Sequence, residues 1–327
     1  MKRFIRIILY TILVIVGLAG AGVLYFFLKY PDVDPPSMLT IERTLDRVER
    51  GKYLVTHVSG CLDCHSTRDW KYFAAPIIPG TEGKGGEVFD ENFGIPGKLF
   101  ARNITPAGIG TMTDGELLRV LTSGVDRNGK VLFPLMPYSN FNEMSEEDLY
   151  SIIAYIRTLQ PIENSVSTSQ VNFPVNLIIR TVPTKHQPHP EPNRNNQYEY
   201  GKYLVMNAGV CGDCHTPQVK GKTIKGMDFS GGMEFRTPFG MIRSANITPD
   251  EETGIGMWTK EIFINRFKEF ASPKSSSMSP DSMNYYTIMP WTSFSGMTEE
   301  DLGAIYSHLR TLTPVGHKVE HFTALKK

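Results

Sequence analysis

Two short motifs decide how this chain is interpreted: residues 61–65 read CLDCH and residues 211–215 read CGDCH. Together they contain all four cysteines of the 327-residue chain. Two thiols three positions apart on one helical turn can each form a thioether with a haem vinyl group, and the adjacent histidine then faces the iron, so CxxCH is typical of c-type haem attachment. The sequence therefore predicts two covalently bound haem c groups. The expected attachment residues are Cys61, Cys64, Cys211 and Cys214, and the expected histidine ligands of iron are His65 and His215.

Other uses of paired cysteines fit this pattern less well. A disulfide within CxxC closes only a tiny loop and cannot staple distant segments. A thioredoxin-like redox pair needs a βαβ context that the pattern lacks, and a structural zinc site typically has its two CxxC pairs about 15–20 residues apart. Here the two pairs lie far apart at equivalent positions, which favours haem.

An internal repeat contains both motifs. Residues 51–65 read GKYLVTHVSGCLDCH and residues 201–215 read GKYLVMNAGVCGDCH. Further matched blocks follow in the same order: GG at 85–86 and 231–232, NITP at 103–106 and 246–249, GIG at 108–110 and 254–256, MP at 136–137 and 289–290, and EEDL at 146–149 and 299–302. Blocks that keep their order while their spacing changes indicate one duplicated domain with loop insertions.

The repeat sets the expected domain organisation. We expect domains at 42–160 and 198–318, joined by a linker at 161–197 that is rich in proline in its second half. Within that linker, FPVNLII at 173–179 is apolar enough to pack across a domain interface. The largest insertion, serine-rich, runs from Ser272 to Asn284 and predicts an exposed loop.

Helical periodicity recurs in both copies. The expected helices lie around 51–58 and 201–207, at 114–123 and 259–270, and after the N-cap residues Ser145 and Thr298, with Pro161 and Pro314 beyond their ends. Long glycine-rich stretches with little strand pattern separate these helices, and they exceed ordinary connections. The pattern predicts an all-α fold whose loops are ordered by a large buried cofactor.

The N-terminus carries 22 consecutive uncharged residues, Ile7 to Leu28, and about 20 suffice to cross a bilayer core. Three cations precede this stretch and aromatic residues follow it, so residues 1–30 are expected to form a single transmembrane anchor with the N-terminus in the cytoplasm. The remainder then lies in the periplasm, attached to a bacterial inner membrane. The alternative is a cleaved secretory signal, whose apolar stretch is usually about 7–15 residues. Both readings export the rest of the chain.

The composition is that of a globular protein without charge bias. Apolar residues make up 41% and charged residues 21%, and the 34 basic residues balance the 34 acidic ones. A nucleic-acid partner would require a basic excess to neutralise phosphates, so none is expected.

Met136 and Met289, each followed by proline in equivalent blocks, are the expected sixth ligands of iron. His/Met ligation raises the reduction potential and leaves no vacant site for oxygen or peroxide. The alternative is that they are core residues, since the chain has 14 methionines. A second matched pair, Met144 and Met297, precedes the terminal helices and is explained by packing onto their first turns.

Three further expectations concern the surroundings of the iron ligands. The repeated NITP is either an ordinary turn or a turn that contacts haem propionates or the methionine loop. The backbone carbonyl of Pro217, or of its counterpart Thr67, is a candidate partner for the second nitrogen of the ligand histidine. The remaining histidines have no matched counterpart and are expected at the surface.

Taken together, GKYL with CxxCH, NITPD with GIG.W, and the MP and EEDL blocks resemble the dihaem class I cytochromes c, particularly the cytochrome subunits of membrane-bound alcohol and related sugar or aldehyde dehydrogenases. The resemblance covers about residues 42–160 and 198–315. It implies two all-α haem domains that pass electrons from a periplasmic quinoprotein or flavoprotein dehydrogenase toward a quinone or a terminal oxidase. Many members of that subgroup carry three haem domains, and this chain has two.

The expected function is therefore that of a membrane-anchored dihaem electron carrier with a redox protein as its partner and no catalytic residues of its own. The alternative is a haem enzyme, such as a dihaem peroxidase or a thiosulfate-oxidising cytochrome. Such chemistry usually needs a vacant or unusual distal site, and two matched methionine candidates count against it.

Overall fold

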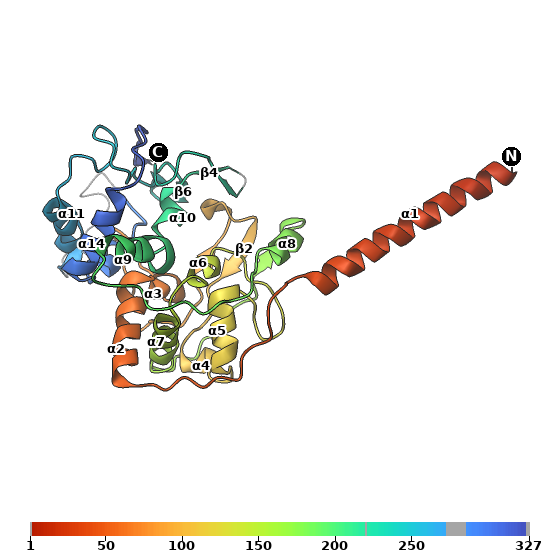
Figure 1. The fold of residues 1–327 in the computed structure, drawn as a ribbon, viewed down its shortest axis with the longest axis horizontal. Coiled ribbons are helices and arrows are strands. Elements are labelled where there is room, and N and C mark those ends of the chain that lie inside the picture. Colours follow the sequence, from red (N-terminus) through yellow and green to blue (C-terminus); the bar gives the residue numbers. More distant parts are fainter. Residues whose placement is uncertain (1, 220, 273–285, 325–327) are drawn as a thin grey trace.

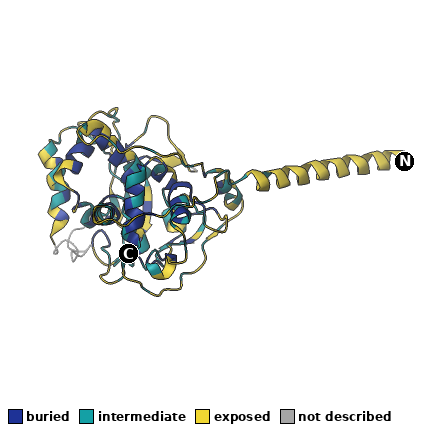
Figure 2. Cartoon of the chain, turned by 60° about the horizontal axis from the view of Figure 1, so that its bottom comes forward, coloured by how far each residue is buried: buried dark blue, intermediate teal, exposed yellow. Residues whose placement is uncertain are grey.

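One long helix, α1 (Lys2–Lys29), projects away from the rest of the chain (Figure 1). The computed structural model describes residues 2–219, 221–272 and 286–324, so the serine-rich insertion expected at 272–284 lies outside the described residues except for Ser272. Along α1 the side chains are exposed on all sides (Figure 2). Among the described residues, α1 is the one helix that is long and apolar enough to cross a membrane, a test that a signal sequence also passes.

The remaining helices repeat in two halves. In the first half they are α2 (Leu45–Tyr53), η1 (Leu54–Val58), α3 (Cys61–His65), α4 (Pro106–Ile109), α5 (Asp114–Ser123), α6 (Tyr138–Phe141) and α7 (Glu146–Ile156). In the second half they are α9 (Gln197–Tyr203), η4 (Leu204–Ala208), α10 (Cys211–His215), α11 (Lys260–Lys268), α13 (Trp291–Phe294) and α14 (Glu299–Leu309). Between the halves lie α8 (Val175–Ile178) and η3 (Ile179–Thr181), and the described residues also form the short 3₁₀ turns η2 (Glu91–Phe93) and η5 (Glu269–Ala271).

Capping residues explain where several of these helices begin. The Ser145 and Thr298 side chains accept hydrogen bonds from the backbone N–H of Asp148 and Asp301, as expected for N-caps. These helices end at Ile156 and Leu309, ahead of the prolines that were expected to stop them. The expected helix at 114–123 is confirmed.

The first helix of each half begins earlier than expected, because Thr44 and Asn196 cap it. It then continues as a π-helical turn, η1 or η4, directly before CxxCH. The helix expected at 259–270 is shorter and ends in the 3₁₀ turn η5.

In each half, the glycine of the repeated GKYL block lies at the point where two helices cross with their backbones in contact. A Cβ at Gly51 would lie 1.8 Å from the carbonyl oxygen of Ser151 in α7, and one at Gly201 would lie 1.9 Å from that of Ala304 in α14. Real Cβ atoms do not approach this closely, since side-chain volume keeps packed helices farther apart. The pairs α2–α7 and α9–α14 therefore require glycine at these positions.

Short strands correct the expectation of an all-α fold. Three antiparallel strands, β1 (Val88–Phe89), β2 (Gly97–Phe100) and β3 (Gln170–Val171), pair in that order, and so do β6 (Glu234–Thr237), β7 (Gly240–Arg243) and β8 (Phe322–Ala324). A small hairpin joins β4 (Gln218–Val219) and β5 (Lys222–Thr223). Strands of two to four residues are too short to produce an alternating pattern, which is why the sequence did not predict them.

The strands also tie later segments to each half. Gln170 and Val171, within the expected linker, pair with β2, while Phe322 to Ala324 pair with β7. One apolar core runs continuously through both halves, from Leu54 and Leu149 in the first to Leu204 and Leu302 in the second. Figure 2 shows this buried material as dark helices inside the globular part.

Candidate functional site

Each CxxCH motif forms a single helical turn, α3 or α10, that starts after a residue in the left-handed backbone region. In the first half this residue is Gly60 at φ 60°, and in the second it is Val210 at φ 45°. The left-handed region is unfavourable for a β-branched residue, so the surrounding structure must hold Val210 in place. The reversal separates the CxxCH turn from the preceding π-helical turn.

The two candidate ligand histidines are oriented by backbone carbonyls. Nδ1 of His65 lies 2.7 Å from the oxygen of Arg102, and Nδ1 of His215 lies 2.7 Å from the oxygen of Ala245. A carbonyl can only accept, so Nδ1 carries the proton and Nε2 is left free to bind a metal. Burial lowers the pKa of both imidazoles, which favours the neutral form that ligation requires. The expectation that Thr67 and Pro217 supply these carbonyls is wrong.

The repeated NITP turn holds those carbonyls in place. Asn103 directly follows Arg102; its Oδ1 accepts hydrogen bonds from the N–H (2.9 Å) and hydroxyl (2.7 Å) of Thr105, and its Nδ2 donates to the oxygen of Ile162 (2.8 Å). Asn103 is buried, so these bonds replace hydration that it lacks. The turn therefore connects the carbonyl that orients His65 to the segment beyond α7.

The second half repeats this arrangement. Asn246 accepts from the N–H (2.9 Å) and hydroxyl (2.7 Å) of Thr248 and donates to the oxygen of Val315 at 2.7 Å. The exact repetition of the tetrapeptide was the signal that could have found this role. What the sequence could not identify was the partner, a backbone oxygen of Ile162 or Val315.

The repeated glycine pairs bind the backbone carbonyl of each candidate ligand histidine. The N–H of Gly85 donates to the carbonyl of His65, and that of Gly231 donates to the carbonyl of His215, both at 2.7 Å. Both glycines have positive φ, and a Cβ on either would lie within about 2.5 Å of backbone atoms. The GG block is therefore part of the histidine's support.

The four thiols are free and are not paired in disulfides. Burial raises the pKa of the Cys61 and Cys211 thiols to about 12, whereas a redox-active CxxC pair has a lowered pKa. Within residues 2–219, 221–272 and 286–324, no three His, Cys, Asp or Glu side chains gather as a metal site. Two adjacent thiols beside a histidine with a free Nε2 fit a covalently attached haem.

The two matched methionine pairs differ in burial. Met144 and Met297 are fully buried in the core, in agreement with a packing role. Met136 and Met289 are half-buried, each before a proline that caps a short helix, α6 or α13. Their ligation of iron stays a prediction.

The segments that lead into the two CxxCH motifs lie next to each other. The π-helical turns η1 and η4 are in contact, and a Cβ at Gly209 would lie 3.7 Å from the carbonyl oxygen of Val58. Burial, and more weakly its charged and thiol neighbours including Cys64, raise the pKa of the Cys214 thiol to about 12. The attachment points in the two halves are thus close enough to influence each other.

The second half also contacts the first motif directly. The hydroxyl of Ser293 in α13 donates a 3.0 Å hydrogen bond to Oδ1 of the buried Asp63. Nδ1 of His57 in η1 lies 2.9 Å from the oxygen of Ser293. His57 is half-buried, whereas His308 is buried, so the expectation that the remaining histidines lie at the surface is wrong for His308.

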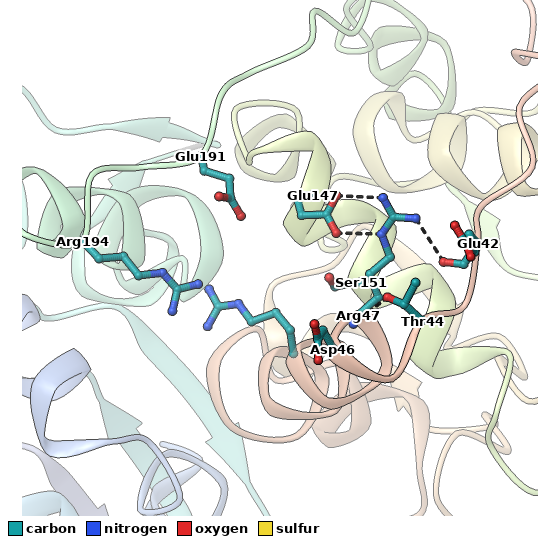
Figure 3. Close-up of a pocket in the computed structure, with 9 residues that line it drawn as sticks. Glu42, Thr44, Asp46, Arg47, Glu147, Ser151, Glu191 and Arg194 are labelled. Atoms are coloured by element: carbon teal, nitrogen blue, oxygen red, sulfur yellow. Dashed lines mark hydrogen bonds and ion pairs between the residues drawn. The ribbon is translucent and has the colours of Figure 1, made fainter.

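A pocket of about 520 Å³ lies apart from both motifs, between α2, α7 and the segment at Glu191 to Arg194 (Figure 3). The guanidinium of Arg47 donates hydrogen bonds to both carboxylate oxygens of Glu147 there, at 2.6 and 2.9 Å. No CxxCH residue lines this pocket. It is a charged crevice between helices and not a haem cradle.

No family model matches the chain. It is 26% identical over 290 residues to the cytochrome c subunit of a quinone-type alcohol dehydrogenase from Gluconacetobacter polyoxogenes, covering 84% of this chain and 58% of the relative. It is 26% identical over 279 residues to the fructose dehydrogenase cytochrome subunit of Gluconobacter japonicus, covering 81% and 52%. The chain is a homologue of dehydrogenase cytochrome c subunits. The resemblance seen in its motifs is thereby confirmed.

A smaller relative matches as well. A dihaem c-type cytochrome of Cereibacter sphaeroides is 27% identical over 214 residues, covering 63% of this chain and 68% of the relative. This homologue of dehydrogenase cytochrome subunits thus spans little more than half the length of the two dehydrogenase subunits.

Proposed function

We propose that the chain is a membrane-anchored dihaem cytochrome c that receives electrons from a periplasmic dehydrogenase and passes them toward a quinone or a terminal oxidase. The observation that carries the proposal is the pair of CxxCH turns, each with its histidine Nδ1 bound to a backbone carbonyl and each preceded by a π-helical turn that contacts its counterpart in the other half. Haem c would supply a one-electron iron couple at each turn.

The proposed sites follow the repeat. Cys61 and Cys64 would hold one haem, with His65 and Met136 as ligands of its iron; in the second half Cys211, Cys214, His215 and Met289 would have the same roles. The proposed domains are two tandem cytochrome c units at 42–160 and 198–318, joined by residues 161–197. Contact between η1 and η4 supports short-range electron transfer between the two halves, since it brings the attachment segments together.

The chain's own residues would favour electron transfer over substrate chemistry. A neutral histidine and a soft thioether stabilise reduced iron and leave no open coordination position. The carbonyls of Arg102 and Ala245 fix the ring planes of the two histidines, so oxidation and reduction require little rearrangement.

The proposed location is a bacterial inner membrane. Residues 1–30 would cross it once, with the N-terminus in the cytoplasm and both domains in the periplasm, because cations precede the apolar stretch and an aromatic belt follows it. The helix α1 stands clear of the globular part, as an anchor would (Figure 1).

The spectrum of the purified holoprotein tests the electron-carrier proposal. We expect two haems per chain by pyridine haemochrome, low-spin ferric iron, a far-red sulfur-to-iron charge-transfer band, and no carbon monoxide binding by the native reduced protein. High-spin ferric haem or carbon monoxide binding would instead indicate an open coordination site and a haem enzyme.

A further inference from the structure

An exposed apolar surface lies beside the end of α1. Phe173, just before the short helix α8, is 77% exposed, and Ile178, the last residue of α8, is 57% exposed. The segment at 173–179 was expected to pack across a domain interface, and this is wrong for these two side chains. Only Ile179 is buried, against Val125 and Val131 of the first half.

Arg180 fixes this segment to α1. Its guanidinium lies over the ring of Phe27, 5.1 Å from the centroid, and donates a hydrogen bond to the backbone oxygen of Tyr30. Because Ile179 is anchored in the first half while Arg180 holds the last turn of α1, α8 cannot move far from the helix end. Figure 1 shows α8 beside the C-terminal end of α1, on the side of the globular part nearest to that helix.

The length of α1 sets the depth of this contact. Its uncharged stretch, Ile7 to Leu28, contains 22 residues and at about 1.5 Å per residue spans about 33 Å, close to the hydrocarbon thickness of about 30 Å. Phe27 and Tyr30 then lie at the boundary of the hydrocarbon, where the headgroup layer adds about 5–7 Å. Side chains fixed next to them lie in or at that layer.

We propose that Phe173 and Ile178 insert into the periplasmic headgroup layer and form a second membrane contact. The inference rests on the proposed membrane anchoring by α1. The occupant is a lipid surface, because the patch continues the apolar surface of a candidate membrane span. Lys29 pairs with Asp32 and Lys185 with Asp34, and Arg180 is held against Phe27 and the backbone of Tyr30, so we expect the contact to be mainly apolar and insensitive to salt.

Two points of attachment would fix how the haem domains face the membrane. A single helix followed by an extended segment leaves a domain free to rotate and tilt. The contacts of Arg180 with α1 and of α8 with lipid would remove that freedom, so that the same surface always faces a partner in the bilayer.

Site-directed spin labelling of the full-length holoprotein tests this. With both haems attached no thiol remains free, so a single cysteine can be introduced and labelled as Phe173→Cys or Ile178→Cys. The control is Ile262→Cys, at a position that is 50% exposed. It belongs to α11, a helix on the opposite side of the globular part from α1 (Figure 1). Each protein is reconstituted into vesicles of phosphatidylethanolamine and phosphatidylglycerol.

We expect the labels at 173 and 178 to collide more with oxygen than with a water-soluble nickel complex, and the label at 262 to show the reverse, at low and high salt alike. Labels at 173 and 178 that behave like the label at 262, in vesicles that carry the protein, would overturn the contact. Labels inaccessible to both reagents would also overturn it, because they would indicate a protein partner or a second copy on this surface. Vesicle flotation separates the two proposals, since failure of the protein to float would refute the anchor itself.

Discussion

The hydroxyl of Tyr53 donates a 2.7 Å hydrogen bond to Oδ2 of Asp301, 248 residues further along the chain. The equivalent residues make the same bond with the halves exchanged: the hydroxyl of Tyr203, in the second half, donates to Oδ2 of Asp148, in the first, at 2.6 Å. Tyr53 and Tyr203 belong to the repeated GKYL blocks, and the two aspartates to the repeated EEDL blocks. The halves are thus joined by crossed, nearly symmetric contacts between their own repeated motifs.

Further crossed bonds surround this pair. The side-chain amide of Asn140 in α6 donates to the oxygen of Met206 in η4, and that of Asn207 in η4 donates to the oxygen of Glu143, both at 2.8 Å. These bonds fix η4, and the contact of His57 with the oxygen of Ser293 fixes η1; the two turns lead into the two CxxCH motifs. Its stability bears directly on the spacing of the two attachment sites.

Loss of the Tyr53 hydroxyl is expected to destabilise the protein more than loss of the Tyr203 hydroxyl. In Tyr53→Phe, Asp301 would keep only a 3.4 Å contact with Tyr200, and the N–H of Thr298 would lose its acceptor. In Tyr203→Phe, Asp148 would retain both bonds to Arg50. We expect costs of about 2–3 kcal/mol and about 1 kcal/mol in the free energy of unfolding.

Denaturant unfolding of the detergent-solubilised holoprotein, followed by circular dichroism, measures both costs. Tyr198→Phe, at a half-exposed position, serves as the control and should change little. Equal losses in Tyr53→Phe and Tyr203→Phe would refute the asymmetry.

Replacing either candidate methionine ligand is expected to open one haem. Met136→Ala should remove about half of the far-red charge-transfer band, lower one of the two midpoint potentials, and allow about one carbon monoxide to bind per chain, because the soft sixth ligand is gone. Met289→Ala should do the same at the other haem. Optical titration and carbon monoxide binding measure these effects.

The matched control is Met144→Leu. Met144 is fully buried, and a swap of similar volume should cost less than about 1.5 kcal/mol while leaving the spectrum unchanged. If the band survives in Met136→Ala, another group ligates that iron.

Asn103 is expected to act on the iron through the carbonyl that it positions. That carbonyl accepts from Nδ1 of His65 and thereby raises the basicity of the imidazole, which favours oxidised iron. Asn103→Ala would loosen the carbonyl, so the midpoint potential of the haem on His65 should rise while that of the haem on His215 stays constant. The loss of three hydrogen bonds at a buried site should also cost about 2–3 kcal/mol of stability.

Spectroelectrochemistry resolves the two potentials, and Asn246→Ala provides the mirror-image control. Asn103→Asp keeps the acceptor for Thr105 and replaces the donor to Ile162 with a negative charge. Both the kept acceptor and the added charge should lower the potential from its value in Asn103→Ala. A purely structural role would leave both potentials unchanged in Asn103→Ala while stability falls.

Alanine at Gly51 or Gly201 is expected to destabilise the helix crossing, although alanine normally gains about 1 kcal/mol over glycine within a helix. The added Cβ would lie within 2 Å of a carbonyl oxygen in the partner helix, and overpacking costs about 1–3 kcal/mol or more. Thermal unfolding of the holoprotein checks the sign. The exposed neighbour Lys52→Ala should stay within about 0.5 kcal/mol, and stabilisation by Gly51→Ala would contradict the crossing.

Local patterns in the sequence determined a large part of this protein. CxxCH predicted the haem-attaching residues, the repeat located equivalent positions, and Ser145 and Thr298 marked helix starts that the structure has. A run of 22 uncharged residues predicted α1. Each of these signals lies in one contiguous stretch or in the recurrence of short contiguous blocks, so no knowledge of the fold is needed to read it.

Only the tertiary structure decided which distant groups meet. All backbone carbonyls are chemically alike, so the sequence could not select Arg102 over Thr67 as the partner of His65, because the choice depends on how 37 residues of loop return to the CxxCH turn. The strands were too short to leave a periodic pattern. The bond between Tyr53 and Asp301 likewise arises only when two halves, each encoded by the same local pattern, pack against each other.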